Sequence, residues 1–160
     1  MKKTSSNVLK TVCVFALICI IVWLVFYAIQ TYFVLTTGRG NGVLNWDSPH
    51  IGRKLTVFVI NRITILTLAG LMAAFVHNIL KHLKGGRIFN HANVVLLWIM
   101  AIVLPIHSFI SDNMVFACSD IDHYDWCLTD TPFVYAIVAV LVAILYKLAY
   151  DAAEEQKLTI

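Results

Sequence analysis

Four long apolar runs constrain this chain more than any other feature of its sequence. They cover residues 11–35, 55–80, 92–111 and 132–150, and each is close to or above the ~20 residues that a helix needs to cross the hydrocarbon core of a bilayer. Only helices or closed barrels satisfy their backbone groups in lipid, and these runs lack the alternation of barrel strands. The sequence therefore predicts an all-α fold, a four-transmembrane-helix bundle in which residues 1–160 form a single integral membrane domain.

The composition agrees with a chain that has lipid as its solvent. Hydrophobic residues make up 60% of the 160 residues and charged residues only 13%, whereas soluble domains are usually ~45–50% apolar and ~25% charged. The formal net charge of +3 is small and spread along the chain. We therefore expect no direct binding of nucleic acid.

The basic residues between the runs predict the orientation. They precede the first run, join the second to the third and follow the fourth: Lys2, Lys3, Lys10, Lys81, Lys84, Arg87, Lys147 and Lys157. Residues 112–131 contain no Lys or Arg, although residues 36–54 contain three. The positive-inside rule then places both termini in the cytoplasm. The first run is longer than the apolar part of a signal peptide, so we expect an uncleaved helix. In the first outer loop, Trp46 is expected to lie at the membrane interface with Leu44 beside it.

Arg62 is the costliest residue to place inside a membrane. It lies about two turns into the second run, and an intramembrane arginine costs ~2.5 kcal/mol or more unless it has a partner or reaches water. The third run is antiparallel and brings His107 and Asp112 to a similar level, so we expect an intramembrane polar cluster of Asn61, Arg62, His107 and Asp112. Two interpretations stay open: a proton- or ligand-responsive site, and a structural ion pair or an arginine that extends to the surface.

Two cysteines fall in the second outer loop. Cys118 and Cys127 flank the sequence SDIDHYDW, and disulfides persist outside the cytoplasm, so we expect a disulfide between them. A thiol oxidoreductase would need a second outer pair, but Cys13 and Cys19 fall in the first run.

No other pattern predicts catalysis or a cofactor. The acidic outer loop, with its Asp120, Asp122, His123, Asp125 and Asp130, does not match the EF-hand template, so we expect no metal. The histidines near the spans are at unmatched depths for a haem. There is no phosphate-binding glycine loop, nucleophile elbow or helical H-E-x-x-H. We expect a protein that is not an enzyme and holds no cofactor.

Two features predict how the helices end and pack. Gly85 and Gly86 are expected to end the second helix, and Asn90 to cap the third. Lys84 and Arg87 then lie where anionic lipid headgroups attract them. Small residues on the second and fourth helices permit close packing on neighbouring helices: Ala69, Gly70, Ala73, Ala74, Ala136, Ala139 and Ala143. A homo-oligomer formed through the same faces is the alternative.

The stretch GGRIFNHANV resembles the Gly-basic-x-Phe-x-x-x-Asn-Val turn of a bacterial family of small four-helix membrane proteins, classified only as a domain of unknown function. The ending EEQKLTI is similar to that family's closing Glu-Glu/Gln-x-Leu-Thr-Val/Ile signature. The matching positions are Gly86, Arg87, Phe89, Asn93 and Val94, then Glu154, Glu155, Leu158, Thr159 and Ile160. The apolar VVLLWIM that follows the turn departs from the family, whose members often carry basic residues there.

The resemblance implies a bacterial inner-membrane location and no enzymatic activity. Members of the family are often encoded beside a small helix-turn-helix regulator, so the resemblance suggests a cytoplasmic DNA-binding protein as partner. We expect a regulatory membrane protein whose partner-binding residues lie in the turn and the tail: Lys84, Arg87, Phe89, Asn93, Glu154, Glu155 and Leu158. The alternative is an oligomeric transporter or channel subunit that uses the Arg62, His107 and Asp112 cluster.

Overall fold

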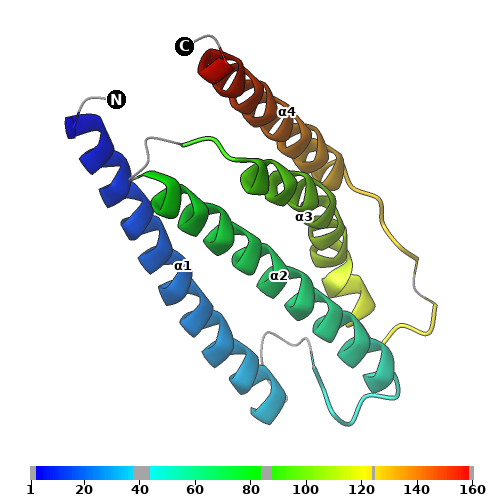
Figure 1. Cartoon of the computed structure of the whole chain (residues 1–160). Coiled ribbons are helices and arrows are strands. Elements are labelled where there is room, and N and C mark those ends of the chain that lie inside the picture. Colours follow the sequence, from blue (N-terminus) through cyan, green and yellow to red (C-terminus); the bar gives the residue numbers. More distant parts are fainter. Residues whose placement is uncertain (1–2, 38–43, 84–87, 124, 159–160) are drawn as a thin grey trace.

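The computed structural model describes residues 3–37, 44–83, 88–123 and 125–158, and every regular element in these residues is a helix. In chain order they are α1 (Lys3–Thr37), α2 (Ile51–Leu83), α3 (His91–Ala117) and α4 (Thr131–Leu158) (Figure 1). All four are long and apolar enough to cross a membrane. The prediction of an all-α chain with four candidate spans is confirmed.

Each helix is longer than the apolar run that predicted it. The 33 residues of α2 extend over about 50 Å at 1.5 Å per residue, whereas the hydrocarbon core is ~30 Å thick and the bilayer with its headgroups ~40–45 Å. An apolar run marks only the part of a helix in hydrocarbon. The helix continues through the interface, where polar side chains are tolerated.

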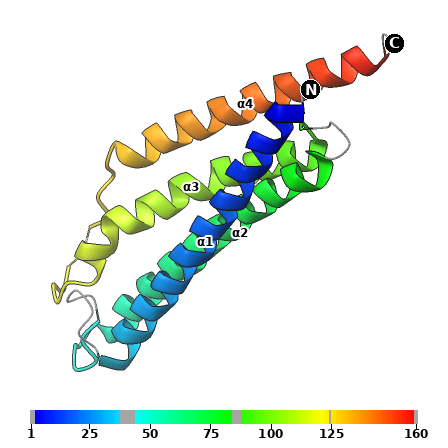
Figure 2. The same cartoon turned by 90° about the vertical axis from the view of Figure 1, so that its left-hand side faces the viewer.

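The four helices form an open row. Among the described residues, backbones approach closely only between sequence neighbours, that is α1 with α2, α2 with α3, and α3 with α4. Figures 1 and 2 show α1 and α4 as the outer members of this row, with both chain termini at one end. We call that end the terminal end. The opposite end, which carries residues 44–50, 118–123 and 125–130, is the loop end.

Apolar side chains of the spans face outward, and the helix contacts bury polar ones. Only 6–17% of the most apolar window of each span is buried within the chain. The buried polar residues are Ser48, Lys54, Asn61, Asn93, Ser108 and Asn113. This distribution suits a lipid solvent, because in hydrocarbon polar groups, and not apolar ones, gain from turning inward.

The small residues of α4 are buried to different degrees, and Ala136 and Ala139 are half-buried. Ala143 is fully buried and Ala101 nearly so, in a pair of helices, α3 and α4, that approach closely. In α2, Ala69 is buried but Gly70 is exposed with open space around it. Gly70 therefore makes no close helix approach within the described chain, and a homo-oligomer stays a prediction.

The loop end holds the apolar core cluster. The cluster consists of Val34 of α1, Leu44 from the segment before α2, and Phe58 of α2, and Met114 of α3 packs against it. The expectation that Leu44 lies at the surface beside Trp46 is wrong, because Leu44 is fully buried while Trp46 is half exposed. The chain before α2 folds back and inserts Leu44 between the helices.

Candidate functional site

The segment before α3 and the terminal part of α4 pack together at the terminal end. The ring of Tyr146 in α4 lies 5.3 Å from that of Phe89 and 5.5 Å from that of Phe75 in α2, measured between centroids. The Tyr146 hydroxyl donates a hydrogen bond to the Ile88 carbonyl at 3.2 Å. Tyr146 thus joins the segment before α3 to α4, about two turns before Glu154, the first of the tail residues assigned to partner binding. We call residues 88–89 together with Tyr146 and residues 147–158 the terminal surface.

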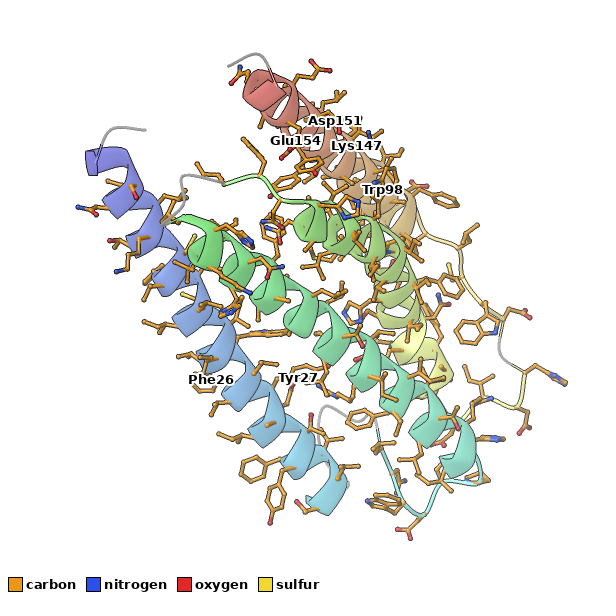
Figure 3. All side chains as sticks on the ribbon, viewed as in Figure 1. Phe26, Tyr27, Trp98, Lys147, Asp151 and Glu154 are labelled. Carbon is orange, nitrogen blue, oxygen red and sulfur yellow. The ribbon has the colours of Figure 1, made fainter. Side chains whose placement is uncertain are left out.

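The tail of α4 brings charge to this surface. Lys147 and Asp151 form an ion pair at 2.6 Å, and Figure 3 shows Lys147, Asp151 and Glu154 along the terminal part of α4. Glu155 is exposed and Glu154 half-buried. Lys84, Arg87 and the side chain of Leu158 lie outside the described residues, as do Gly85 and Gly86.

Asn93 occupies a different position from the one expected of a partner-binding residue. Its side chain is fully buried, accepts a hydrogen bond from the Asn78 amide at 3.0 Å and donates to the Phe75 carbonyl at 3.2 Å. Its backbone N–H donates to the Asn90 side chain at 2.9 Å, which confirms Asn90 as the N-cap of α3. Asn93 therefore positions the start of α3 against α2, and its assignment as a contact for a partner is corrected.

The intramembrane polar cluster forms, with a membership that differs from the prediction. Asn61 donates to Ser111 at 2.8 Å and accepts from the Tyr27 hydroxyl at 3.3 Å. His107 lies within hydrogen-bond distance of Thr64, at 2.9 Å, and of Ser111, at 3.4 Å. Ser111 thus links Asn61 to His107 in a chain of polar contacts across α1, α2 and α3. Its spacing of four residues from His107 could have identified it from the sequence.

Arg62 and Asp112 do not pair with each other, and that part of the prediction is corrected. The guanidinium carbon of Arg62 lies 4.1 Å from the ring centroid of Tyr27 and 4.5 Å from that of Phe58. Asp112 instead accepts a hydrogen bond from Thr129. Ser111 lies on the face of α3 that meets α2. The next residue of a helix points about 100° away, so Asp112 lies at the level of Arg62 but does not face α2.

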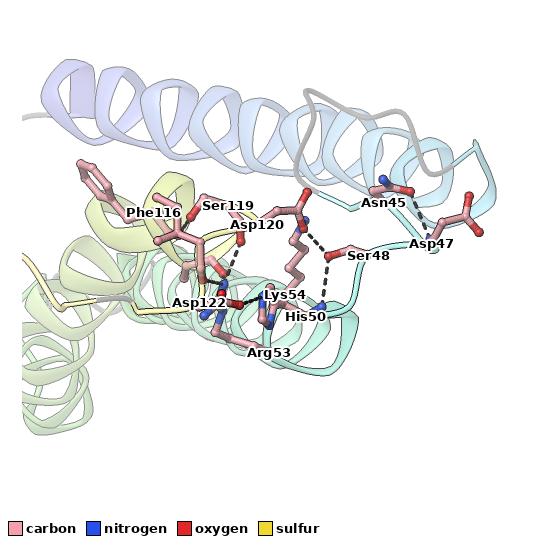
Figure 4. Close-up of polar contacts among 12 residues, drawn as sticks. Asn45, Asp47, Ser48, His50, Arg53, Lys54, Phe116, Ser119, Asp120 and Asp122 are labelled. Carbon is pink, nitrogen blue, oxygen red and sulfur yellow. Dashed lines mark hydrogen bonds and ion pairs between the residues drawn. The ribbon is translucent and has the colours of Figure 1, made fainter.

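A second polar network, missed by the sequence analysis, closes the loop end (Figure 4). Lys54 is 2% exposed and its ammonium lies 2.7 Å from the Asp120 carboxylate. Asp120 also accepts a hydrogen bond from Ser48. His50 contacts Asp122 at 3.1 Å. The hydrogen bond from Lys54, followed by that from Ser48, lowers the pKa of Asp120 below its usual value.

Arg53 holds the end of α3 in the same network. Its Nε donates to the carbonyl of Ala117 at 3.1 Å, and its Nη2 to those of Ser119 at 2.8 Å and Ile121 at 3.0 Å. The last carbonyls of a helix lack intrahelical donors and carry partial negative charge, so an arginine is favourable there. Arg53 and Lys54, two of the three basic residues that depart from the positive-inside pattern, are thus bound by groups of residues 117–121.

The predicted disulfide is absent. Cys118 and Cys127 are both free thiols, the first buried and the second exposed. The side chain of Asn113 binds the backbone of Cys127 at both its N–H, 2.6 Å, and its carbonyl, 2.8 Å. Asn113 precedes Cys118 by five residues, about 7.5 Å along α3. This clamp holds Cys127 along the helix and away from Cys118.

Comparison with known proteins adds no relative. No protein-family model matches the chain, and no curated protein or solved structure is similar to it.

Proposed function

We propose that this chain is a regulatory protein of the bacterial inner membrane, with both termini in the cytoplasm, that binds a cytoplasmic partner through its terminal surface. The observation that carries the proposal is the position of Tyr146, which contacts Phe89 and Ile88 before α3 as well as Phe75 of α2. Residues 88–89, within the first segment that resembles the family of four-helix membrane proteins, therefore lie beside α4, about two turns before the second such segment begins at Glu154.

The length of α4 supports a surface that projects from the membrane. Its 28 residues extend over about 42 Å, against ~30 Å of hydrocarbon. Figure 2 shows the end of α4 reaching beyond the segment that leads into α3. A helix that is already formed and fixed by Tyr146 loses little conformational freedom on binding, which favours affinity.

The charge of the tail suits a basic partner. Asp151, Glu154 and Glu155 follow one another within two turns of α4. DNA-binding proteins carry clustered Lys and Arg, and complementary charge speeds association and selects partners. A cytoplasmic helix-turn-helix regulator, which the family resemblance suggests, has this chemistry.

Affinity purification from native membranes tests the proposal with two variants of the full chain. One lacks residues 154–160, and the matched control carries Asp125→Asn at an exposed position of the loop end. We expect the wild type and the control to recover the same small basic cytoplasmic protein, and the truncated chain to lose it. Recovery of that protein by the truncated chain, or of none by the wild type, would contradict the proposal.

One observation favours the alternative of an oligomeric transporter or channel subunit. Polar contacts run across three helices from Tyr27 to His107, beside Arg62. An open row of four helices encloses no pore by itself, so this function requires association of several copies. Arg62→Ala should then abolish ion or solute flux in liposomes, and a folded variant with normal flux would refute it.

A further inference from the structure

The guanidinium of Arg62 has no anionic partner among the described residues. It takes no part in the ion pairs His50–Asp122, Lys54–Asp120 and Lys147–Asp151. The Nε of Arg62 is shielded from solvent and has no hydrogen-bond partner, while the guanidinium carbon lies over Tyr27 and Phe58. A cation at membrane depth with an unmet donor is costly, and such positions commonly bind a ligand or a counter-ion.

The depth of Arg62 places it just inside the hydrocarbon. Lys54 and Lys81 mark the two ends of α2 and are 27 residues apart, about 40 Å, which matches a bilayer with its headgroups. Arg62 is eight residues from Lys54, about 12 Å, and therefore roughly 6 Å below the headgroup region of the loop-end leaflet. An anionic group of an amphiphile from that leaflet reaches this level by a small displacement.

The helices offer few carboxylates at this level, in this chain or in a second copy. Neither α1 nor α2 contains Asp or Glu. In α3 the one acidic residue, Asp112, accepts a hydrogen bond from Thr129. Those of α4 lie near its terminal end. No carboxylate of the described helices therefore pairs with Arg62, and an anion from the bilayer fits this position.

An apolar groove lies between α1 and α2 at a deeper level than Arg62. Cys19, Ile20 and Trp23 of α1 and Ala69 and Met72 of α2 line it, and its volume is about 280 Å³. Trp23 stacks on Tyr27 with 5.4 Å between the ring centroids, and the Arg62 guanidinium lies over the same Tyr27 ring. Ala69 and Met72 follow Arg62 by seven and ten residues, so the groove extends about 10–15 Å deeper along α2.

We propose that Arg62 and this groove bind a long-chain fatty acid from the loop-end leaflet. The carboxylate pairs with the guanidinium and satisfies its unmet donor, and the alkyl chain lies in the groove between α1 and α2. A guanidinium binds a carboxylate through two parallel hydrogen bonds. The groove is at the lower limit of ligand pockets, which hold ~300–1,000 Å³, so it fits one alkyl chain better than the two chains of a phospholipid. This inference is independent of the proposed regulatory function, which concerns the terminal surface.

Quenching of Trp23 fluorescence by a brominated fatty acid tests the proposal. The full-length chain, with Trp46, Trp98 and Trp126 replaced by Phe, is reconstituted in phosphatidylcholine vesicles and titrated with 9,10-dibromostearate or its methyl ester. We expect saturable quenching by the acid and at least about tenfold weaker binding of the uncharged ester, since a charged hydrogen bond contributes ~1.5–3 kcal/mol. This comparison needs no change at Arg62. Equal quenching by acid and ester would overturn the proposal.

Three variants locate the site. Arg62→Gln should weaken binding of the acid about tenfold, and Met72→Phe, which fills the groove, should weaken it as well. Lys81→Gln, which removes an exposed charge of the same helix at its other end, should change the affinity by less than about twofold. Equal loss in Lys81→Gln and Arg62→Gln would show surface attraction instead of a site. Stronger quenching by dibrominated phosphatidylglycerol than by the acid would refute the assignment to a fatty acid.

Discussion

Replacing Asn93 by Leu should destabilise the packing of α2 against α3 by an amount that the structure allows us to estimate. The Asn93 side chain makes two interhelical hydrogen bonds, with the Asn78 amide at 3.0 Å and the Phe75 carbonyl at 3.2 Å. Hydrogen bonds between membrane helices contribute ~0.6 kcal/mol on average and ~1.7 kcal/mol at most. Asn93→Leu keeps the side chain similar in size, so its cost should be about 1–2 kcal/mol.

A double-mutant cycle separates the energy of the hydrogen bond between Asn93 and Asn78 from that of the other contacts of Asn93. Asn78→Leu alone should cost about 0.6 kcal/mol, and the pair should show a coupling energy of similar size. Reversible unfolding in mixed micelles, followed by helical circular dichroism, measures all four proteins, with Asn7→Leu as an exposed control that should change stability by less than ~0.5 kcal/mol. The reasoning is refuted by an Asn93→Leu protein as stable as the wild type, or by a coupling energy of zero.

Three further predictions follow from the two ends of the chain. Tyr146→Phe loses one hydrogen bond and should lower the free energy of unfolding by about 0.6 kcal/mol. Tyr146→Ala also loses two ring contacts and should lower it by roughly 1–3 kcal/mol more. The same unfolding assay measures both. Maleimide labelling with mass spectrometry should find Cys127 modified well before Cys118, which is buried. Burial raises the pKa of the Cys118 thiol, and the positive charges of Lys54 and Arg53 offset this rise only in part. A peptide with a Cys118–Cys127 disulfide would contradict the prediction. The pKa of Asp120 is lowered in the folded chain, so its contribution to stability is present above the usual carboxyl pKa and lost as the pH falls through the folded value. Hydrogen exchange at the loop end should accelerate on acidification in the wild type, and Asp120→Asn should reduce that dependence.

The fold was predictable because hydrocarbon admits few structures. Four apolar runs of sufficient length predict four spanning helices, and the described residues form four helices that are long and apolar enough to span a membrane. The ends of the helices were less predictable, since the polar interface permits a helix to continue beyond its apolar run. Where a specific cap was available, at Asn90, the start of the helix was predicted correctly.

The polar cluster was predictable in depth but not in direction. Counting residues along antiparallel helices brought Asn61 and His107 to one level, and Ser111 does link them. Depth alone does not decide which face of a helix a residue occupies, and Asp112 turns to Thr129 instead of Arg62. His107 and Ser111 are four residues apart and therefore lie on one face of α3, and this spacing would have identified the face that meets α2.

The sequence contains a signal for the loop-end network. Arg53 and Lys54 lie in the first turn of α2, and Asp120 comes just after α3, so antiparallel packing places opposite charges at one end of the row. The disulfide prediction failed for a different reason. Sequence spacing shows that two cysteines are in the same loop, but only the contacts of Asn113 show that the backbone of Cys127 is held elsewhere.

The central claim, that the terminal surface binds a cytoplasmic partner, is tested most directly by photocrosslinking in living cells. A benzophenone amino acid replaces Glu155, which is exposed on the tail of α4, or as a control Asp125, which is exposed at the loop end. We expect an adduct with one cytoplasmic protein from position 155 and none with that protein from position 125. Absence of an adduct at 155, or the same adduct from both positions, would contradict it.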